Sequence, residues 1–267
     1  MCGIVGYVGS RQCTEVLIDA LSKLEYRGYD SAGIAVFDNG EIKVAKSKGR
    51  LKDLENKMEK EGTPNGFAGI GHTRWATHGE PSDVNSHPHS GERVTIVHNG
   101  IIENYKPLKE FLLSQGRVFQ SETDTEVVAQ LLDYYYDGNP LETIKKVMHE
   151  LEGSFALGIV FADFKDTVYA VRCESPLIVG VGENESFIAS DVPAILKYTK
   201  DYYLLEHGEI AVLNKSGVTV YDRHLNEIKK ELKTADWDMD AAEKGGYEHF
   251  MLKEIHEQPN AIKTTIA

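Results

Sequence analysis

The sequence has few cysteines and no long apolar run. Its three cysteines lie at positions 2, 13 and 173, and no two of them form a CxxC pair. An odd, scattered count argues against a disulfide framework or a thiolate zinc site, and favours a reducing, cytoplasmic environment. The longest apolar stretches, such as FALGIVFA at 155–162, are far too short to span a bilayer, and no secretory signal pattern is present.

Positive charge is also scarce. The chain carries 29 Lys and Arg against 42 Asp and Glu, so its formal net charge is −13. This balance disfavours nucleic acid and anionic membranes as partners. Neither GxxxxGK[ST] nor a strand-linked GxGxxG occurs, so nucleotide binding has no support, and no cofactor is predicted.

Histidine is concentrated in one part of the chain. Five of the ten histidines lie between positions 72 and 98, but no HExxH occurs and no carboxylate stands at a familiar ligand spacing. We therefore predict no metal site. A metal-dependent hydrolase stays open as a minority alternative.

The periodicity of apolar residues changes along the chain. Strands are predicted at 3–9, 67–73 and 93–100, with a hairpin around Asn39-Gly40, and helical patterns at 14–28, 51–61, 104–115, 121–136 and 141–151. Thr123 and Glu126 match a capping box at the start of the fourth helix. From 153 to 221, short strands follow one another, interrupted by a short helix at VPAILKY. This order predicts an α+β fold with stacked antiparallel sheets covered by helices.

Cys2 directly follows the first methionine and begins an apolar strand. It is either a small buried hydrophobe, as most free cysteines are, or a nucleophile. The second interpretation requires removal of Met1, which would place a free α-amine beside the thiol. Such an amine has a pKa of about 7.7–8.0, so roughly a tenth or more of these amines are neutral at pH 7 and can accept the thiol proton. Position alone leaves both open.

Three polar motifs could complete a site. The first motif is HTRWATHG, at 72–79. Arg74 could bind a substrate carboxylate or form a surface ion pair, and Trp75 could act as a gate or anchor the loop. Thr77 and His78 could hydrogen-bond a substrate or stabilise the turn. Asn99 and the Gly100 N–H could converge on an oxyanion, or form an ordinary turn. Asp124 would stabilise the first turn of its helix, and could also bind an ammonium group.

Six motifs together resemble the class II glutamine amidotransferase family. They are CGIVGYVG at 2–9, YRGYDSAGIA at 26–35, GHTRWATHG at 71–79, NSHPH at 85–89, VHNGIIEN at 97–104 and SETDTE at 121–126. Within that family, the closest resemblance is to the N-terminal glutaminase half of the glutamine–fructose-6-phosphate aminotransferases. Amidophosphoribosyltransferases share the terminal cysteine but are less similar across these motifs, and remain an alternative.

The resemblance implies a four-layer α/β/β/α N-terminal-nucleophile fold and a set of roles. Cys2 would attack the side-chain amide of L-glutamine, and Asn99 and Gly100 would stabilise the oxyanion. The amino-acid end of the substrate would be held by Arg74, through its carboxylate, and Asp124, through its ammonium. Of the remaining residues, the resemblance places Thr77 and His78 in the loop over the substrate, Trp75 at an ammonia gate, and Arg27 and His87 near the pocket.

The resemblance also implies a division of the chain. Residues 2–222 would form the glutaminase domain, and 223–267 a linker and the start of a sugar-isomerase half. The full-length enzyme would be a homodimer that uses fructose 6-phosphate, so this chain alone would release ammonia without making glucosamine 6-phosphate. A non-catalytic regulatory module, with Cys2 as a core residue, remains a third possibility.

Overall fold

The computed structural model describes residues 2–236 and 247–266. Met1, Ala267 and part of the predicted linker, 237–246, lie outside the described residues, so the processing of Met1 and that part of the linker stay predictions. No helix among the described residues is both long and apolar enough to cross a membrane.

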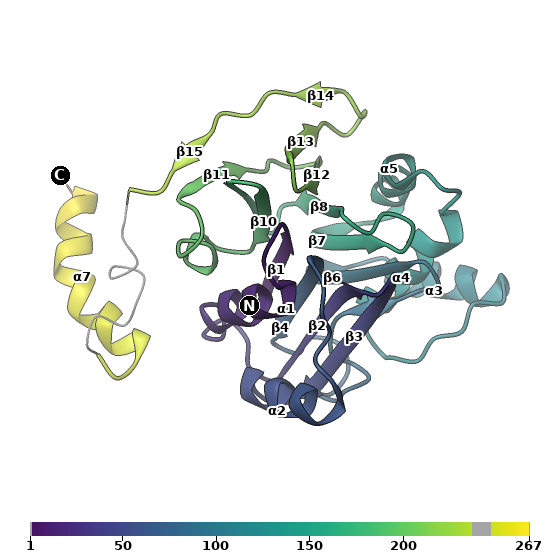
Figure 1. The fold of residues 1–267 in the computed structure, drawn as a ribbon, viewed down its shortest axis with the longest axis horizontal. Helices are drawn as coiled ribbons and strands as arrows, with labels where there is room; N and C mark the ends of the chain where they lie inside the picture. Colours follow the sequence, from purple (N-terminus) through teal and green to yellow (C-terminus); the bar gives the residue numbers. More distant parts are fainter. Residues whose placement is uncertain (1, 237–246, 267) are drawn as a thin grey trace.

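Two antiparallel sheets form the centre of the fold (Figure 1). The first has the order β15-β11-β9-β10-β1-β4-β2-β3, and the second β14-β13-β12-β8-β7-β6-β5. The first sheet comprises β1 (Gly3–Val8), β2 (Ser31–Asp38), β3 (Glu41–Lys48), β4 (Ala68–Arg74), β9 (Ile178–Gly182), β10 (Glu185–Ala189), β11 (Asp201–Leu204) and β15 (Lys233–Thr234). The second comprises β5 (His89–Ser90), β6 (Val94–Ile102), β7 (Gly153–Phe161), β8 (Val168–Cys173), β12 (Glu209–Asn214), β13 (Gly217–Tyr221) and β14 (Glu227–Ile228).

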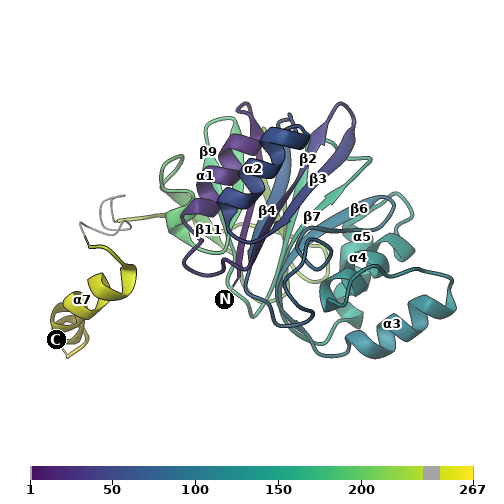
Figure 2. The ribbon, with the colours of Figure 1, turned by 90° about the horizontal axis from the view of Figure 1, so that it is seen from below.

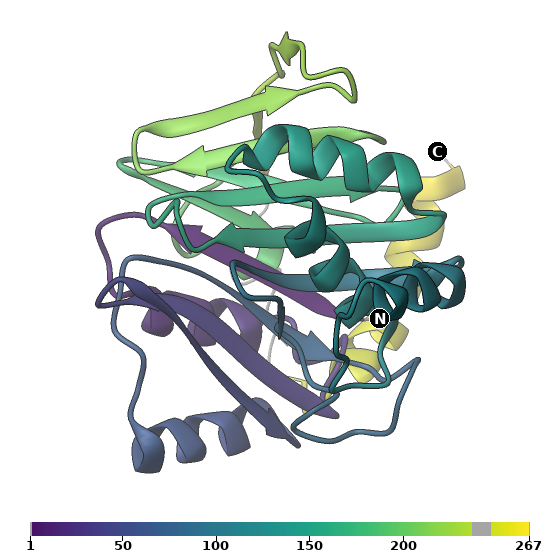
Figure 3. The same ribbon diagram turned by 90° about the vertical axis from the view of Figure 1, so that its right-hand side faces the viewer.

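Helices cover the outer face of each sheet (Figure 2). Helices α1 (Cys13–Ser22) and α2 (Leu51–Glu61) lie on the first sheet. Helices α3 (Tyr105–Ser114), α4 (Asp124–Tyr135) and α5 (Pro140–Glu150) lie over the second, and Figure 3 looks onto them. The four layers confirm the α+β prediction of two stacked antiparallel sheets between helices.

Alternation along the strands produces three apolar layers. In β1, Val5 and Tyr7 pack with the α1 and α2 cluster, whereas Ile4 and Val8 pack between the two sheets. A third cluster joins α4 and α5 to β6 and β7. Because successive strand residues point to opposite faces, a strand with apolar residues at every position must be buried on both sides. This explains why β1, at the start of the chain, is held in the core and not frayed.

Local sequence patterns predict some boundaries of helices correctly and others incorrectly. Thr123 caps α4 by accepting from the N–H of Glu126 at 3.2 Å, as predicted. The reciprocal half of the capping box does not form, because the Glu126 carboxylate instead accepts from the N–H groups of Gln120 at 2.8 Å and Ser121 at 2.6 Å. The first helix ends at Ser22, well before the predicted residue 28, and turns follow it.

Other predicted elements change in kind. The helix predicted at VPAILKY is one 3₁₀ turn, Val192–Ala194, with Pro193 in its first turn. Strands β5, β11, β14 and β15 are not predicted, because two to four residues are too few for a period to be recognised. The tail forms helix α7 (Phe250–Ile266), which Figures 1 and 2 show apart from the two sheets. The division at residue 222 remains a prediction.

Candidate functional site

Cys2 lies where β1 meets the end of β4. Gly3 pairs with Thr73 across the two strands, so Cys2 faces the residues that leave β4. The Cys2 sulfur accepts from the Trp75 N–H at 3.2 Å, and its thiol faces the Trp75 carbonyl oxygen at 3.4 Å. Burial raises the pKa of the Cys2 thiol, and the hydrogen bond from Trp75 lowers it in part. The thiol is therefore held in its protonated form and needs a base to become a nucleophile.

A small cavity of about 20 Å³ opens beside the Cys2 sulfur. Its lining brings together eight of the predicted residues with three others: Cys2, Arg74, Trp75, Thr77, His78, His87, Gly100 and Asp124, with His98, Thr123 and Thr125. The other two predicted residues bind the Cys2 carbonyl oxygen, Asn99 through Nδ2 at 3.0 Å and Arg27 through Nε at 3.3 Å. Residues spread over a hundred positions of the sequence thus meet around one thiol.

Arg74 lines this cavity and has one donor without a partner among the described residues. Its side chain is only 3% exposed. Nη2 donates to the carbonyl oxygens of His78 and of Gly79, the latter at 3.0 Å. Nη1 is buried and has no hydrogen-bond partner among the described residues. A buried guanidinium N–H without an acceptor is costly, so this geometry suits an anionic ligand.

Asp124 supplies the opposite charge. It is 3% exposed, at the first position of α4, where the helix dipole favours a carboxylate. Oδ2 accepts from the Ile102 N–H at 2.9 Å, while Oδ1 lies 4.0 Å from Nδ1 of His78. One buried cation and one buried carboxylate line the same cavity, which suits a zwitterion. Asp124 both begins the helix and faces the cavity, so its two interpretations are compatible.

Asn99 is held in one orientation by three neighbours. Its Oδ1 accepts from Nε2 of His72 at 3.0 Å, and Nδ2 donates to the Cys2 carbonyl oxygen and to Oγ of Ser190 at 2.9 Å. Both N–H bonds of the amide are therefore engaged in this state. To bind an oxyanion, the amide must release one of these two acceptors, or share one N–H between that acceptor and the oxyanion.

Gly100 occupies a position that only glycine fits. Its φ is +123°, which side chains rarely allow, and a Cβ there would run into the backbone carbonyl of Ser154. The residue lines the cavity with Cys2. The Asn-Gly pair therefore lies within strand β6, and does not form the tight turn considered as its alternative.

Trp75 and His87 line the cavity, and Arg27 contacts the Cys2 carbonyl oxygen beside it. Arg27 joins the Cys2 carbonyl to Asp191, with Nη1 3.1 Å from the Asp191 carboxylate. The Trp75 side chain is 50% exposed and meets Tyr29 edge to face at 5.7 Å. The His87 ring stacks on His72 with centroids 4.1 Å apart.

Sequence reasoning missed several residues that position the site. Asp30 accepts from the Ala76 N–H and donates its own N–H to the Arg74 carbonyl at 3.1 Å, which fixes the turn after β4. His72 and Asp30 both lie inside motifs quoted above, so a signal for them existed. Ser190 lies far along the chain and carries no such signal, because only the pairing of β10 with β1 brings it to Asn99.

Four buried histidines form a cluster at the cavity, and two of them, His87 and His98, are part of its lining. Burial lowers the pKa of each, to about 3 for His72, so all four are neutral near pH 7; they are His72, His87, His89 and His98. Where their ring nitrogens have partners, these include a backbone carbonyl, a backbone N–H, an amide oxygen and threonine hydroxyls. Across the described ranges, no group of three His, Cys, Asp or Glu residues is placed to hold a metal ion.

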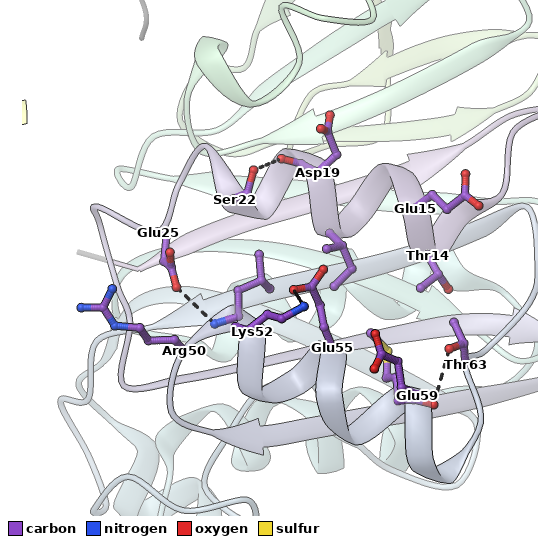
Figure 4. A pocket seen from close by; sticks show the side chains of 13 residues that line it. Thr14, Glu15, Asp19, Ser22, Glu25, Arg50, Lys52, Glu55, Glu59 and Thr63 are labelled. Carbon is purple, nitrogen blue, oxygen red and sulfur yellow. Dashed lines mark hydrogen bonds and ion pairs between the residues drawn. The ribbon is translucent and has the colours of Figure 1, made fainter. Parts of the chain in front are cut away.

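A larger hollow, of about 720 Å³, lies between α1 and α2. Figure 4 shows its rim of acidic side chains, among them Glu15, Asp19, Glu55 and Glu59. It contains none of the predicted site residues and no cysteine. Its size therefore gives no reason to move the candidate site away from Cys2.

A sequence profile for a glutamine amidotransferase domain matches residues 72–197. The matched segment includes Arg74, Asn99, Gly100 and Asp124, but not Cys2. The whole chain is 58% identical to a glutamine–fructose-6-phosphate aminotransferase (isomerizing) of Caldanaerobacter subterraneus subsp. tengcongensis, and 56% identical to that of Clostridium tetani. In both cases the chain spans only 44% of the relative's length.

Among solved structures, a glutamine phosphoribosylpyrophosphate amidotransferase of B. subtilis matches with a TM-score of 0.73. The match covers 85% of this chain and 50% of that chain, at 26% identity. Together with the two stacked sheets, this similarity confirms the predicted four-layer N-terminal-nucleophile fold.

Proposed function

The chain carries a glutamine amidotransferase domain, and on that premise we propose that it hydrolyses L-glutamine to glutamate and ammonia. One observation supports this most directly. The Cys2 thiol, a buried Arg74 N–H without a partner and the Asp124 carboxylate line the same cavity. A nucleophile between a cation and an anion suits an amino acid that carries an amide on its side chain.

Hydrolysis proceeds through a thioester. Removal of Met1 gives Cys2 a free α-amine, which accepts the thiol proton as sulfur attacks the amide carbon. The oxyanion that forms is stabilised by N–H groups of Asn99 and Gly100. The C–N bond then breaks, the amine returns the proton to the departing ammonia, and a γ-glutamyl thioester remains. Water hydrolyses the thioester to glutamate and restores the thiol.

The amino-acid end of the substrate is held by opposite charges. Arg74 binds the α-carboxylate through Nη1, and Asp124 binds the α-ammonium through Oδ1. The cavity of about 20 Å³ is too small for a glutamine, so the loop that carries Trp75, Thr77 and His78 must open to admit one. In closing, the same loop would cover the substrate, and Trp75 would direct the ammonia.

In the longer protein, this domain would be the N-terminal half and would supply ammonia for the synthesis of glucosamine 6-phosphate from fructose 6-phosphate. Identities of 56–58% to the aminotransferases, against 26% to the phosphoribosylpyrophosphate enzyme, favour this acceptor. We place residues 2–222 in the glutaminase domain and 223–267 at the transition to the sugar-isomerase half. We also propose a homodimer and a cytoplasmic location, the latter because Cys2, Cys13 and Cys173 are all free thiols.

The decisive experiment replaces the nucleophile. Cys2→Ala should abolish glutamate formation from glutamine while circular dichroism and melting temperature stay unchanged. Cys173→Ala, which removes another partly buried thiol, is the matched control and should retain full activity. Intact mass should show that Met1 is absent from the active protein. Hydrolysis by Cys2→Ala, or full activity in protein that retains Met1, would refute the mechanism.

A second assay tests the acceptor. The purified chain, given glutamine and fructose 6-phosphate, should form glutamate but no glucosamine 6-phosphate. Any sugar product would show that the acceptor site lies within these residues.

A further inference from the structure

His98 has a ring nitrogen that the mechanism does not use. It is 3% exposed, lies in β6 next to Asn99, and lines the cavity that contains Cys2, Arg74 and Asp124. Its Nε2 atom is buried and has no hydrogen-bond partner among the described residues. Whether that nitrogen carries a proton decides what it can offer to a ligand.

Three hydrogen bonds around His98 are compatible with a proton on Nε2. The backbone N–H of His98 can only donate, so Nδ1 of His87, 3.3 Å away, is the acceptor. Burial keeps His87 neutral, since it lowers the pKa of that ring well below its usual value, and its proton is therefore on Nε2. From there it is donated to Oγ1 of Thr125 at 3.3 Å.

The last bond returns to the His98 ring. The Thr125 hydroxyl has one proton and two acceptor positions, so it can accept from His87 and donate its own proton to Nδ1 of His98, 2.9 Å away. In this arrangement Nδ1 of His98 is an acceptor, and the proton of the neutral ring is on Nε2, the nitrogen that has no partner among the described residues. A chain of bonds that begins at the His98 backbone can thus end at the His98 ring with every member of the chain satisfied, and this tautomer is the one that the experiment below tests.

We propose that His98 is a substrate-binding residue, which donates its Nε2–H to an oxygen of the glutamine α-carboxylate. This inference rests on the proposed function, because it identifies a further contact to the same substrate. Arg74 Nη1 and His98 Nε2 are both buried nitrogens without partners on the lining of one cavity in the described part of the chain. A carboxylate offers two acceptor oxygens, and two separate donors can each take one.

The neutral state of His98 matters for this contact. Burial lowers the pKa of His98; the charge of Asp124 opposes this effect, and His78 adds to it. A protonated ring would turn Nδ1 into a donor, so the Thr125 hydroxyl would have to rotate and accept from it. Arg74 supplies the positive charge for the carboxylate, so His98 can contribute an N–H without a second buried charge.

The tautomer can be observed directly. The Cys2→Ala chain, labelled with ¹⁵N in histidine, keeps glutamine intact while nuclear magnetic resonance reports the two ring nitrogens. His98 is expected to show a protonated Nε2 and an unprotonated Nδ1, and the Nε2 signal should shift as glutamine is added. A protonated Nδ1 in the neutral ring, or an Nε2 signal that saturating glutamine does not move, would overturn the proposal.

Kinetics test the contribution to binding. His98→Leu should raise KM for glutamine about tenfold to a hundredfold, with kcat changed less than about threefold, since one hydrogen bond to a charged group is lost. Thr125→Val should raise KM by a smaller factor, because the tautomer is no longer selected, and Thr125→Ser should restore it. His89→Leu removes a buried histidine that lies outside the cavity lining, and KM should not change.

The outcomes separate this inference from the proposed function. If the unmodified chain hydrolyses no glutamine, the proposed function fails, and the spectra of Cys2→Ala still decide whether glutamine contacts His98. If the chain is active but His98→Leu folds and keeps its KM, only the role of His98 fails. Should His98→Leu not fold, Thr125→Val and Thr125→Ser carry the kinetic test, and equal KM in both contradicts the proposal.

Discussion

Replacing Gly100 with alanine should damage both stability and activity. The backbone of Gly100 has φ of +123°, and the new Cβ would run into the carbonyl of Ser154 on the paired strand β7. The obstacle is backbone, so it cannot be relieved by rotating a side chain. Strand β6 must shift at the point where Gly100 lines the cavity.

The magnitude follows from two separable terms. A side chain in a sparsely populated φ region costs about 1–3 kcal/mol, and overpacking against a fixed neighbour costs about 1–3 kcal/mol more. Gly138, at φ +103°, has no heavy atom within 4 Å of the place where a Cβ would lie, so Gly138→Ala carries the first term alone. A domain of this size loses about 2–4 °C in melting temperature per kcal/mol, so Gly100→Ala should melt about 2–12 °C below Gly138→Ala.

Activity distinguishes the two variants more sharply. Displacing one oxyanion donor costs on the order of 10²–10³ in kcat, so Gly100→Ala should lose most of its glutamine hydrolysis, while Gly138→Ala should keep it. Calorimetry and a glutamate-release assay measure both quantities on the same preparations. Equal melting temperatures, together with hydrolysis by Gly100→Ala within threefold of the parent, would refute both the close approach and the oxyanion role.

Three further predictions concern charge. Arg74→Lys should raise KM for glutamine on the order of tenfold or more, because an ammonium cannot replace the planar fork; an unchanged KM in steady-state kinetics would exclude the carboxylate contact. Asp133→Ala should lower the free energy of unfolding by about 1–3 kcal/mol without changing KM, because the Arg93 N–H and the Arg117 guanidinium lose the buried carboxylate that accepts from them; urea titration measures this, and a loss below about 0.5 kcal/mol would contradict it. The free energy of unfolding should fall as pH drops below about 6.5, because histidines then become protonated in the unfolded chain but stay neutral where they are buried in the folded one. Each such histidine contributes up to about 1.4 kcal/mol per pH unit, over a window that for His72 extends to about pH 3; unfolding free energies equal at pH 7 and pH 5 would contradict this.

The sequence was most informative where one short segment determines the structure. The Asn39-Gly40 signal predicted its hairpin, and both residues have positive φ, of 51° and 92°. The second helix falls at 51–61 as its period indicates, and Thr123 caps α4. Each of these depends on contacts within a few residues, which the local pattern contains.

Contacts were predicted less well where segments far apart in the sequence determine a side chain's partners. Sequence reasoning gave Glu126 a capping role, but the folded chain places the N–H groups of residues 120 and 121 nearer to its carboxylate. Asn99 was predicted to bind an oxyanion or to form a turn, but its amide donates to the Cys2 carbonyl and to Ser190, which lies 91 positions further along the chain. No local pattern records such a pairing, so these contacts had to come from the structure.

In the proposed mechanism the α-amine of Cys2 activates its own thiol, and the hydrogen bonds of His87 and His98 are consistent with that role. The Cys2 thiol is protonated, because burial raises the pKa of that group, and an activating base is needed. In the tautomer proposed for His98, Nδ1 accepts from Thr125 and Nε2 carries the proton, so neither nitrogen can act as the base. The ring nitrogens of His87 are engaged by the His98 N–H and by Thr125. Asp124 has its place at the start of α4, where Oδ2 already accepts a backbone N–H. An α-amine on Cys2 itself needs no further side chain, and it exists only after Met1 is removed, so the cleavage of one peptide bond would both expose the nucleophile and supply its base.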